Sequence, residues 1–573
     1  MSVSGGGGGT YPTTQPSLNL DFANTKQLDP RITFVRNSTA AYYDGQTTAM
    51  AEQNLLLQSE NLLTSWTTIN TTVTGGQTDP LGSTTAFKLV AISGGNQGAY
   101  NNGGVFVSGT TYSISGWFKA DSAVSLNIGS TAGSAGVAFS LTTVWTYFSA
   151  SVAATAAGNL WIKPTSSVPI YVWHPQMEQR SSATAYTPTT TAAITNYIPQ
   201  LMTAPAGVAR FDCDPLTRNS LGLLIEESRV NLLTYSSDFS NAVWVKLNAT
   251  ITSNANVAPD GAQTGNQLIE NTANNEHRLR VVTITKTSNQ VLTYSVYVKP
   301  NGRYTQLTME NSGVGLNTIF DVLNNQYIDI VASAGWTRGQ SAITSVGNGW
   351  YRCIISGTTD TALSVNVRIV LASTYSTTIN QVYTGNGYSG IYIWGAQLEA
   401  GSFATSYIPT VASTVTRAAD NASITGTNFS SWYNQAQGSL YAEADTVSSV
   451  TLTPSILSIS DAFGATTNKL NLDFGSSGRF FNYTNSVNNF VLSPLTSGLT
   501  INTPCKCAAS FQPNLVYAVG TGGSVKTSTA MTQMPQNIVQ LRLSDNTFLN
   551  GHIRKLSYYP IALSSSNLVA LTS

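Results

Sequence analysis

Twenty consecutive residues of this chain occur twice, and this duplication constrains the fold more than any other feature. The first copy, IYVWHPQMEQRSSATAYTPT, spans Ile170–Thr189, and the second, IYIWGAQLEAGSFATSYIPT, spans Ile391–Thr410, with eleven identical positions. Each copy has a strand-like start, a turn and a Tyr-x-Pro exit. Pro188 and Pro409 cannot donate to a β-ladder, so each copy is predicted to close one domain and lead into a connector.

The repeat extends beyond this stretch, because other matching residues keep the same order in both copies. The offset between copies is 177 at Asn54/Asn231, 180 at Lys119/Lys299, 205 at Trp145/Trp350 and 221 at Trp173/Trp394. The same order with a growing offset predicts one domain fold used twice, with longer loops in the second copy.

Side chains within each copy alternate with the period of a β-strand. In LTYSVYVK, one face carries the apolar set Leu292, Tyr294, Val296 and Val298. The other face carries Thr293, Ser295, Tyr297 and Lys299. Charged residues make up only 9% of the chain, against about 25% in an ordinary domain, so long Glu/Lys-faced helices are not available. The predicted fold class is all-β: tandem antiparallel β-sandwich (jelly-roll) domains with an extended N-terminal anchor.

Changes in texture along the chain predict six segments. They are an N-terminal anchor (1–50), a first module (51–190), a linker (191–227), a second module (228–410), a linker (411–436) and a C-terminal sandwich with a short helical tail (437–573). Within the anchor, Gly5–Gly9 has a high ordering entropy, so we expect it to become ordered only when docked in a larger assembly.

Charge and cysteine content argue against several classes of protein. The net charge is +0 and no Lys/Arg cluster occurs, so no nucleic-acid partner is expected. No apolar run approaches the roughly 18 residues needed to span a bilayer, so we expect no membrane insertion. The start of the chain does not resemble a secretory signal, so we expect the protein to be made in a cytosol. Four cysteines do not form a disulfide framework; Cys505 and Cys507 are either two metal-binding thiolates or, as we prefer, ordinary strand thiols. No cofactor and no metal site is predicted.

Catalytic patterns are sparse, so the chain is predicted not to be an enzyme and no catalytic residue is assigned. The three histidines, His174, His277 and His552, are distributed one per module, and no G-x-S-x-G elbow occurs. Enzymes that cleave polysaccharides use paired carboxylates, and the adjacent Glu226 and Glu227 lie in a predicted linker. Folding can still bring distant carboxylates together, so a depolymerase remains an alternative.

Aromatic residues on polar strand faces are the best candidates for a sugar site, because sugars stack on aromatic rings beside amide groups. Trp117 and Tyr297 occupy matching positions, and Tyr171/Trp173 match Tyr392/Trp394; the alternative is that these rings belong to a core.

Asn-rich loops are a second candidate for glycan contact. They contain Tyr100 and Asn101 in the first copy and Asn275 and His277 in the second, although such loops are usually simple turns. Glu178 and Glu399 recur in the doubled stretch, either as calcium ligands or, as we prefer, as caps of a turn or partners of an arginine.

Several stretches resemble proteins of tailed-bacteriophage virions of the head-spike or tail-fibre type. They are LNLDFANTKQLDPRITFVRNSTAAYYDG (Leu18–Gly45), RFDCDPLTRNSLGLLIEESRVNLLTYSSDFSNAVW (Arg210–Trp244) and the two closing stretches. The middle modules resemble carbohydrate-binding jelly rolls, and the end of the chain, GHIRKLSYYPIALSSSNLVALTS, resembles a laminin-G or concanavalin-like lectin domain.

This resemblance implies a fibre, spike or capsid-decoration subunit that is assembled in a bacterial cytoplasm and displayed on the virion. It implies a homotrimer that docks onto other virion proteins through residues 1–50 and contacts host cell-surface polysaccharide. The alternatives are a virion-associated polysaccharide depolymerase and a bacterial surface adhesin.

Overall fold

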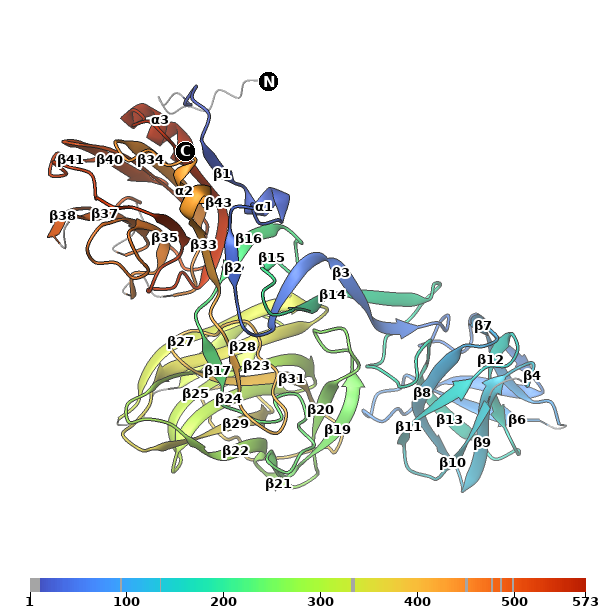
Figure 1. Cartoon of the computed structure of the whole chain (residues 1–573). Helices are drawn as coiled ribbons and strands as arrows, with labels where there is room; N and C mark the ends of the chain where they lie inside the picture. The colour runs from blue at the N-terminus through green and yellow to red at the C-terminus, as the bar shows by residue number, and fades with distance from the viewer. Residues whose placement is uncertain are drawn as a thin grey trace.

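The computed structural model describes residues 11–92, 95–133, 136–330, 335–448, 452–475, 478–484, 487–496 and 499–573. These residues form antiparallel sheets and three short helices, which confirms the predicted all-β class (Figure 1). No described helix has the length and apolar character needed to cross a bilayer. The expectation for Gly5–Gly9 lies outside the described residues.

The first module is a sandwich of two five-stranded sheets with the orders β10-β9-β12-β7-β4 and β11-β8-β13-β6-β5. We call them the β12 sheet and the β13 sheet. Their strands are β4 (Trp66–Ile69), β5 (Thr71–Gln77), β6 (Ala86–Ala91), β7 (Gly98–Phe106), β8 (Thr111–Ala120), β9 (Val124–Ser130), β10 (Gly136–Leu141), β11 (Thr146–Ala153), β12 (Gly158–Pro164) and β13 (Ile170–Glu178). Phe118, Ile128 and Ile162 are buried between the sheets.

The second module is a larger sandwich, with sheets ordered β18-β22-β29-β24-β25-β26 and β19-β20-β31-β23-β28-β27. We call them the β29 sheet and the β31 sheet. Their strands are β18 (Val245–Leu247), β19 (Ala249–Asn256), β20 (Gly265–Glu270), β22 (His277–Thr285), β23 (Val291–Asn301), β24 (Tyr304–Asn311), β25 (Val314–Asp321), β26 (Gln326–Ile330), β27 (Thr337–Gly347), β28 (Trp350–Thr358), β29 (Ser364–Ala372) and β31 (Gly390–Ala400). As predicted, Leu292, Tyr294, Val296 and Val298 all face the core.

The two modules share one strand order, as the doubled sequence predicts. Replacing each first-module strand by its second-module equivalent turns β10-β9-β12-β7-β4 into β25-β24-β29-β22-β18, and the other sheet matches in the same way. The second module adds β26 and β27, one at an edge of each sheet, and these strands account for the rise in offset from 180 to 205. A longer connection between β29 and β31, which contains β30 (Tyr383–Thr384) paired with β21 (Asn274–Asn275), accounts for the rise to 221.

The C-terminal sandwich is assembled from segments far apart in the sequence. Its sheets are ordered β15-β16-β43-β34-β39-β40-β41, with β1 also paired to β43, and β2-β33-β42-β35-β36-β37-β38. The elements are β1 (Leu18–Leu20), α1 (Phe22–Thr25), β2 (Thr33–Val35), β15 (Phe211–Cys213), β16 (Ser220–Ile225), β33 (Asn421–Thr425), α2 (Gly426–Ser430), β34 (Gly438–Ala444), β35 (Ser455–Ser460), β36 (Lys469–Asp473), β37 (Arg479–Thr484), β38 (Val487–Leu492), β39 (Cys505–Gln512), β40 (Leu515–Gly520), β41 (Lys526–Ser528), β42 (Gln540–Leu543), β43 (Gly551–Tyr559) and α3 (Ser565–Thr572).

This assembly differs from the predicted segment boundaries. Leu18, Leu20 and Phe22 of the predicted anchor, and Leu223 and Ile225 of the first predicted linker, are buried in the core of the C-terminal sandwich. The second predicted linker supplies β33 to the same sandwich. The reason is physical: these short apolar strands cannot bury their side chains alone, and the sheets offer them edges.

A two-stranded ribbon connects the first module to the rest of the molecule. β3 (Ala40–Asn54) pairs with β14 (Ile194–Ala204), so the ends of the predicted anchor and linker form one antiparallel element. Figure 1 shows this ribbon reaching from the second module and the C-terminal sandwich to the first module. A shorter pair, β17 (Arg229–Asn231) with β32 (Val415–Arg417), closes the second module where the chain enters and leaves it.

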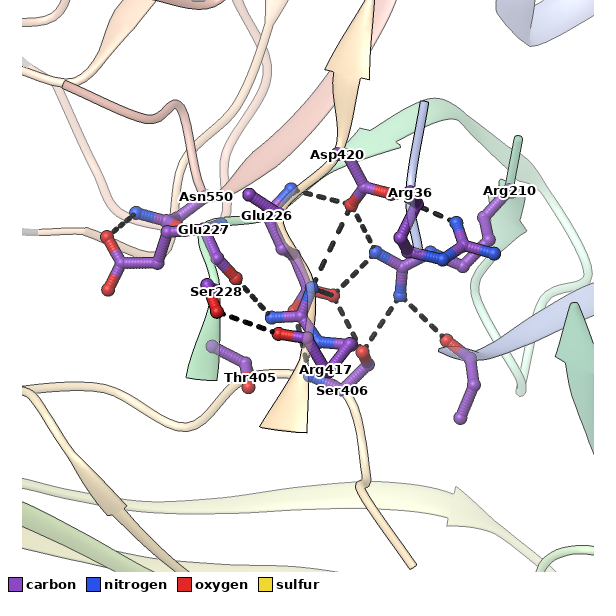
Figure 2. Close-up of polar contacts among 12 residues, drawn as sticks. Arg36, Arg210, Glu226, Glu227, Ser228, Thr405, Ser406, Arg417, Asp420 and Asn550 are labelled. Carbon is purple, nitrogen blue, oxygen red and sulfur yellow. Dashed lines mark hydrogen bonds and ion pairs between the residues drawn. The ribbon is translucent and has the colours of Figure 1, made fainter. Parts of the chain in front are cut away.

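Buried charges hold these crossing segments together at one joint (Figure 2). Asp420 accepts hydrogen bonds from Arg36 at 3.0 Å and from Arg210 at 2.5 Å, and Arg210 also pairs with Glu226 at 2.8 Å. Arg417 lies 3.4 Å from Glu226. Burial opposes the charged form of Glu226, but Arg417 and Arg210 outweigh it and hold the pKa of Glu226 well below its usual range. Removing one partner would leave a buried charge unpaired, so the joint fixes how the segments cross.

Candidate functional site on the first module

In each module, one buried asparagine, Asn54 or Asn231, binds the doubled stretch by hydrogen bonds and so closes the sandwich. We call these hydrogen bonds the polar latch. In the first module, Asn54 donates to the carbonyls of Pro175 and Thr187 and accepts from the amides of Leu56 and Met177. Asn231 makes the four corresponding hydrogen bonds in the second module, to Ala396, Ile408, Leu233 and Leu398. The latch joins the first residues of each module to its last strand and exit.

Glu178 and Glu399 belong to this latch. Each is fully buried and accepts hydrogen bonds from the amide and hydroxyl of one threonine, Thr184 or Thr405. Arg180 lies 3.5 Å from Glu178. The turn-capping interpretation of these two residues therefore holds. Among the described residues, no group of three or more His, Cys, Asp or Glu side chains is arranged to hold a metal ion.

The outer face of the β13 sheet carries aromatic and lysine side chains in two adjacent rows. Tyr147, Trp117 and Trp173 lie side by side across β11, β8 and β13. Lys119, Tyr171 and Lys88 form the next row across β8, β13 and β6. We call these six residues, together with Trp145, the aromatic–lysine ladder. Period-two alternation places them all on the face opposite the core.

Cation–π contacts and ring–ring contacts link the members of the ladder. The Lys119 ammonium lies 4.8 Å from the ring centre of Tyr171 and 5.4 Å from that of Trp145, and the Lys88 ammonium lies 5.7 Å from Tyr171. The rings of Trp117 and Tyr147 are 5.7 Å apart. Aromatic faces attract cations, so the rows hold two positive charges above a ring-lined surface.

The ladder is open to solvent in part. Tyr147 is 44% exposed, and Trp117, Lys119, Tyr171 and Lys88 are half-buried. Tyr388 of the second module borders it, with its ring 6.4 Å from Trp117. At the other end of the row, the ring of Trp173 stacks on His174 at 3.4 Å, and burial lowers the pKa of His174 to about 4, so this imidazole is neutral at physiological pH.

The second module contains the same ladder, but there it is buried. Tyr297, Lys299, Tyr392, Trp394 and Trp350 correspond to Trp117, Lys119, Tyr171, Trp173 and Trp145. Tyr297 and Trp394 are each 3% exposed and pack with Ala41, Tyr43 and Leu201 of the β3–β14 ribbon. Lys299 pairs with Glu52 of β3. The prediction that Tyr297 offers a sugar-binding surface therefore conflicts with its burial.

The structure does not bring the other predicted glycan-binding residues together. Asn101 is fully buried and accepts from the amides of Leu57, Gly103 and Gly104. His277 is fully buried, with its two ring nitrogens 2.6 Å from the Asn248 carbonyl and 3.3 Å from the Tyr383 carbonyl. Both side chains are buried and direct their polar atoms to neighbouring backbone groups, so neither has exposed surface for a ligand.

Tyr100 and Asn275 keep some exposure, but on other surfaces. Tyr100 lies opposite Trp161 on the outer face of the β12 sheet, and exposed Asn275 lies in β21. Of the six predicted residues, Trp117 alone lies on the open ladder of the first module, and Tyr297 lies on the covered ladder of the second. Lys88, the partner of Tyr171, was not predicted as a site residue, although alternation in AFKLVA (86–91) places it on the outer face.

A groove of about 600 Å³ crosses the outer face of the β12 sheet. Its lining includes Trp161, Lys163 and Asn127, and the Lys163 ammonium lies 4.9 Å from the Trp161 ring centre. Trp161 is only 9% exposed, so it offers less ring surface than the ladder. In the second module the corresponding face is covered by the β29–β31 connection, where the Asn380 amide donates to fully buried Gln306.

A cavity of about 390 Å³ lies between the second module and the C-terminal sandwich. His552 lines it, with Nδ1 2.9 Å from Asp445 and Nε2 3.2 Å from Asp212. Burial opposes the imidazolium, but the two carboxylates outweigh it and raise the pKa of His552 to about 10. Both carboxylates are thus engaged by one cation, and because β15, β34 and β43 share one sheet, this cluster is a charged network within the C-terminal sandwich.

The acidic and thiol residues considered as catalytic or metal-binding candidates are engaged in contacts that stabilise the fold. Glu226 belongs to the buried joint, and Glu227 pairs with Arg229 at 2.6 Å. Cys505 and Cys507 are buried in the C-terminal core with their sulfur atoms 3.8 Å apart.

No protein-family model and no curated protein sequence matches this chain. Among solved structures, the tandem CBM22-1–CBM22-2 domains of Paenibacillus barcinonensis Xyn10C match with 10% identity and a TM-score of 0.20, covering 62% of this chain and 98% of that one. The LG1-3 region of the laminin α2 chain matches with 10% identity and a TM-score of 0.20, covering 81% and 96%. Trypanosoma rangeli sialidase matches with 10% identity and a TM-score of 0.21, covering 95% and 99%. At these scores the likenesses carry no argument about function.

Proposed function

We propose that this chain is a structural subunit of a bacteriophage virion, a fibre, spike or decoration protein, and that its first module contacts host-surface glycans through the aromatic–lysine ladder. The observation that carries the glycan part is the contrast between the two modules. One ladder is covered by the protein's own ribbon, and the other presents half-buried Trp117 and Tyr171 to solvent. Partly exposed rings on the outer face of a sheet suit stacking against the C–H faces of sugars.

Binding of the whole chain to a glycan array, followed by affinity measurements on single variants, tests the glycan part. Trp117→Ala and Tyr171→Ala should each weaken binding several-fold to about tenfold, the range expected for one lost stacking contact. Tyr100→Ala is the matched control, because this tyrosine lies on the opposite sheet of the same module. Loss of binding in Tyr100→Ala alone would move the site to the β12-sheet groove.

The virion part rests on the sequence resemblance of Leu18–Gly45 and Arg210–Trp244. Purified particles from a bacterium that carries the gene should contain the chain by mass spectrometry, and antibody labelling should place it on the particle surface. Its absence from intact particles would contradict the proposal. Release of oligosaccharides from a bound polysaccharide would instead support the depolymerase alternative.

A further inference from the structure

We propose that the ladder of the first module selects acidic polysaccharides, those whose sugars carry carboxylates, over neutral ones. This inference rests on the proposed glycan-binding function and specifies its substrate class. It comes from a comparison of the two modules, because the second module shows what covers the same surface when it is occupied.

In the second module, the occupant of the ladder supplies a carboxylate and an apolar surface. Glu52 of the β3–β14 ribbon pairs with Lys299, while Ala41, Tyr43 and Leu201 of the ribbon pack against the rings. Lys299 is thereby neutralised with only 14% of its side chain exposed. An extended polypeptide segment that carries a carboxylate therefore fits onto the ladder of the second module.

In the first module, the corresponding carboxylate is missing from the described part of the chain. Lys119 occupies the position of Lys299, yet neither Lys119 nor Lys88 forms an ion pair with a described acidic residue. The two ladders place their cations differently: Lys88 stands where the second module has Gln267, and Tyr147 stands where it has Arg352. Two unpaired ammonium groups therefore flank one ring, that of Tyr171.

The strand order sets the spacing of these charges. Lys119 lies on β8 and Lys88 on β6, with Tyr171 on β13 between them. Neighbouring strands are about 4.8 Å apart, so the two lysine backbones are separated by roughly 10 Å across the sheet. A polymer that crosses the strands and stacks on Tyr171 can bring one carboxylate to each lysine, whereas a neutral polymer leaves both charges unmatched.

Acidic hexasaccharides and their carboxyl-reduced, neutral counterparts test the inference on the full chain. Mannuronate, galacturonate and polysialate hexasaccharides are suitable probes, measured by isothermal titration calorimetry at low and high salt. The Lys88→Gln/Lys119→Gln double variant should bind the preferred acidic probe roughly tenfold more weakly and lose its salt dependence. Lys163→Gln is the matched control, since Lys163 also lies over an aromatic ring, 4.9 Å from Trp161, on the opposite sheet; it should change affinity less than twofold.

The outcomes separate the two proposals. Equal affinity for an acidic probe and its reduced counterpart, or full affinity in the double variant, overturns the inference, and the proposed function stands if Trp117→Ala still weakens binding. No binding of any hexasaccharide at millimolar concentration overturns both. Circular dichroism of the double variant verifies its fold, which we expect to be unchanged because both lysines are half-buried on an outer face.

Discussion

Single polar residues decide how firmly each module is closed. Asn231 is fully buried and satisfies two amides and two carbonyls of separate segments, and Asn54 does the same in the first module. A side chain with one carbonyl and one amide group is well suited to this task, because it both accepts and donates.

Replacing Asn231 by alanine should therefore lower the free energy of unfolding of the second module by roughly 2–4 kcal/mol, since buried amides and carbonyls lose their partners. Denaturant unfolding measures this loss, and hydrogen exchange at the Leu398 amide should accelerate. The control is Asn275→Ala at an exposed position, which should cost less than about 0.5 kcal/mol. Equal stability of both variants would show that the latch contributes nothing.

His552 should make the stability of the C-terminal sandwich sensitive to high pH. Its pKa rises from 6.5 to about 10 in the folded chain, so the stabilisation is fully present below pH 6.5 and is lost as the pH rises towards 10. The charged groups around it are Asp212 and Asp445, with Arg554 acting on Asp445.

We expect the thermal midpoint of the native chain to fall between pH 7 and 10, and His552→Gln to have a lower midpoint at pH 7 with a flatter profile over this range. Differential scanning calorimetry across the pH range measures both. An unchanged slope in His552→Gln would assign the pH dependence to other groups.

At the scale of elements, the β3–β14 ribbon positions the first module. It packs its apolar residues on the second-module ladder, and Glu52 pairs with Lys299 and accepts from Asn348. A ribbon of two strands is marginally stable by itself, so this docking keeps it ordered.

Glu52→Gln should loosen the ribbon, because it leaves Lys299 with a largely buried, unpaired charge. Limited proteolysis and hydrogen exchange in β14 should both become faster. Glu60→Gln, at a glutamate with a side chain 56% exposed, is the control and should leave both unchanged. Unaltered exchange in Glu52→Gln would mean that apolar packing alone holds the ribbon.

At the scale of the whole molecule, the C-terminal sandwich depends on the start of the chain. Leu18, Leu20 and Phe22 are at most 2% exposed in its core, and β1 adds a strand to its larger sheet. The first module is different, because all described residues of its buried core lie between Leu56 and Met177.

Deleting residues 1–25 should therefore unfold the C-terminal sandwich, since losing three buried side chains costs roughly 5–9 kcal/mol, comparable to the stability of a domain. Deleting residues 1–15 removes no described residue of this core and is the control. By contrast, a fragment of residues 54–190, which contains the described core of the first module, should fold by itself. Cooperative melting of the C-terminal sandwich after the longer deletion, seen by calorimetry, would contradict this dependence.

The sequence by itself determined the fold class, the duplication and the face that each strand residue takes. Alternation in Leu292–Lys299 placed Leu292 and Val296 in the core and Tyr297 and Lys299 outside it, as the structure has them. Such patterns are local, because a pleated strand turns successive side chains to opposite faces whatever surrounds it.

Only the tertiary structure decided what lies over those outer faces. Trp117 and Tyr297 have equivalent positions, yet one is half-buried beside open solvent and the other is covered by a ribbon from residues 40–54 and 194–204. The same limit applies to Leu18 and Leu223, whose partner strand β43 lies hundreds of residues later in the sequence. Burial of an outer face depends on long-range docking between apolar surfaces, and the period of one strand carries no information about its distant partner.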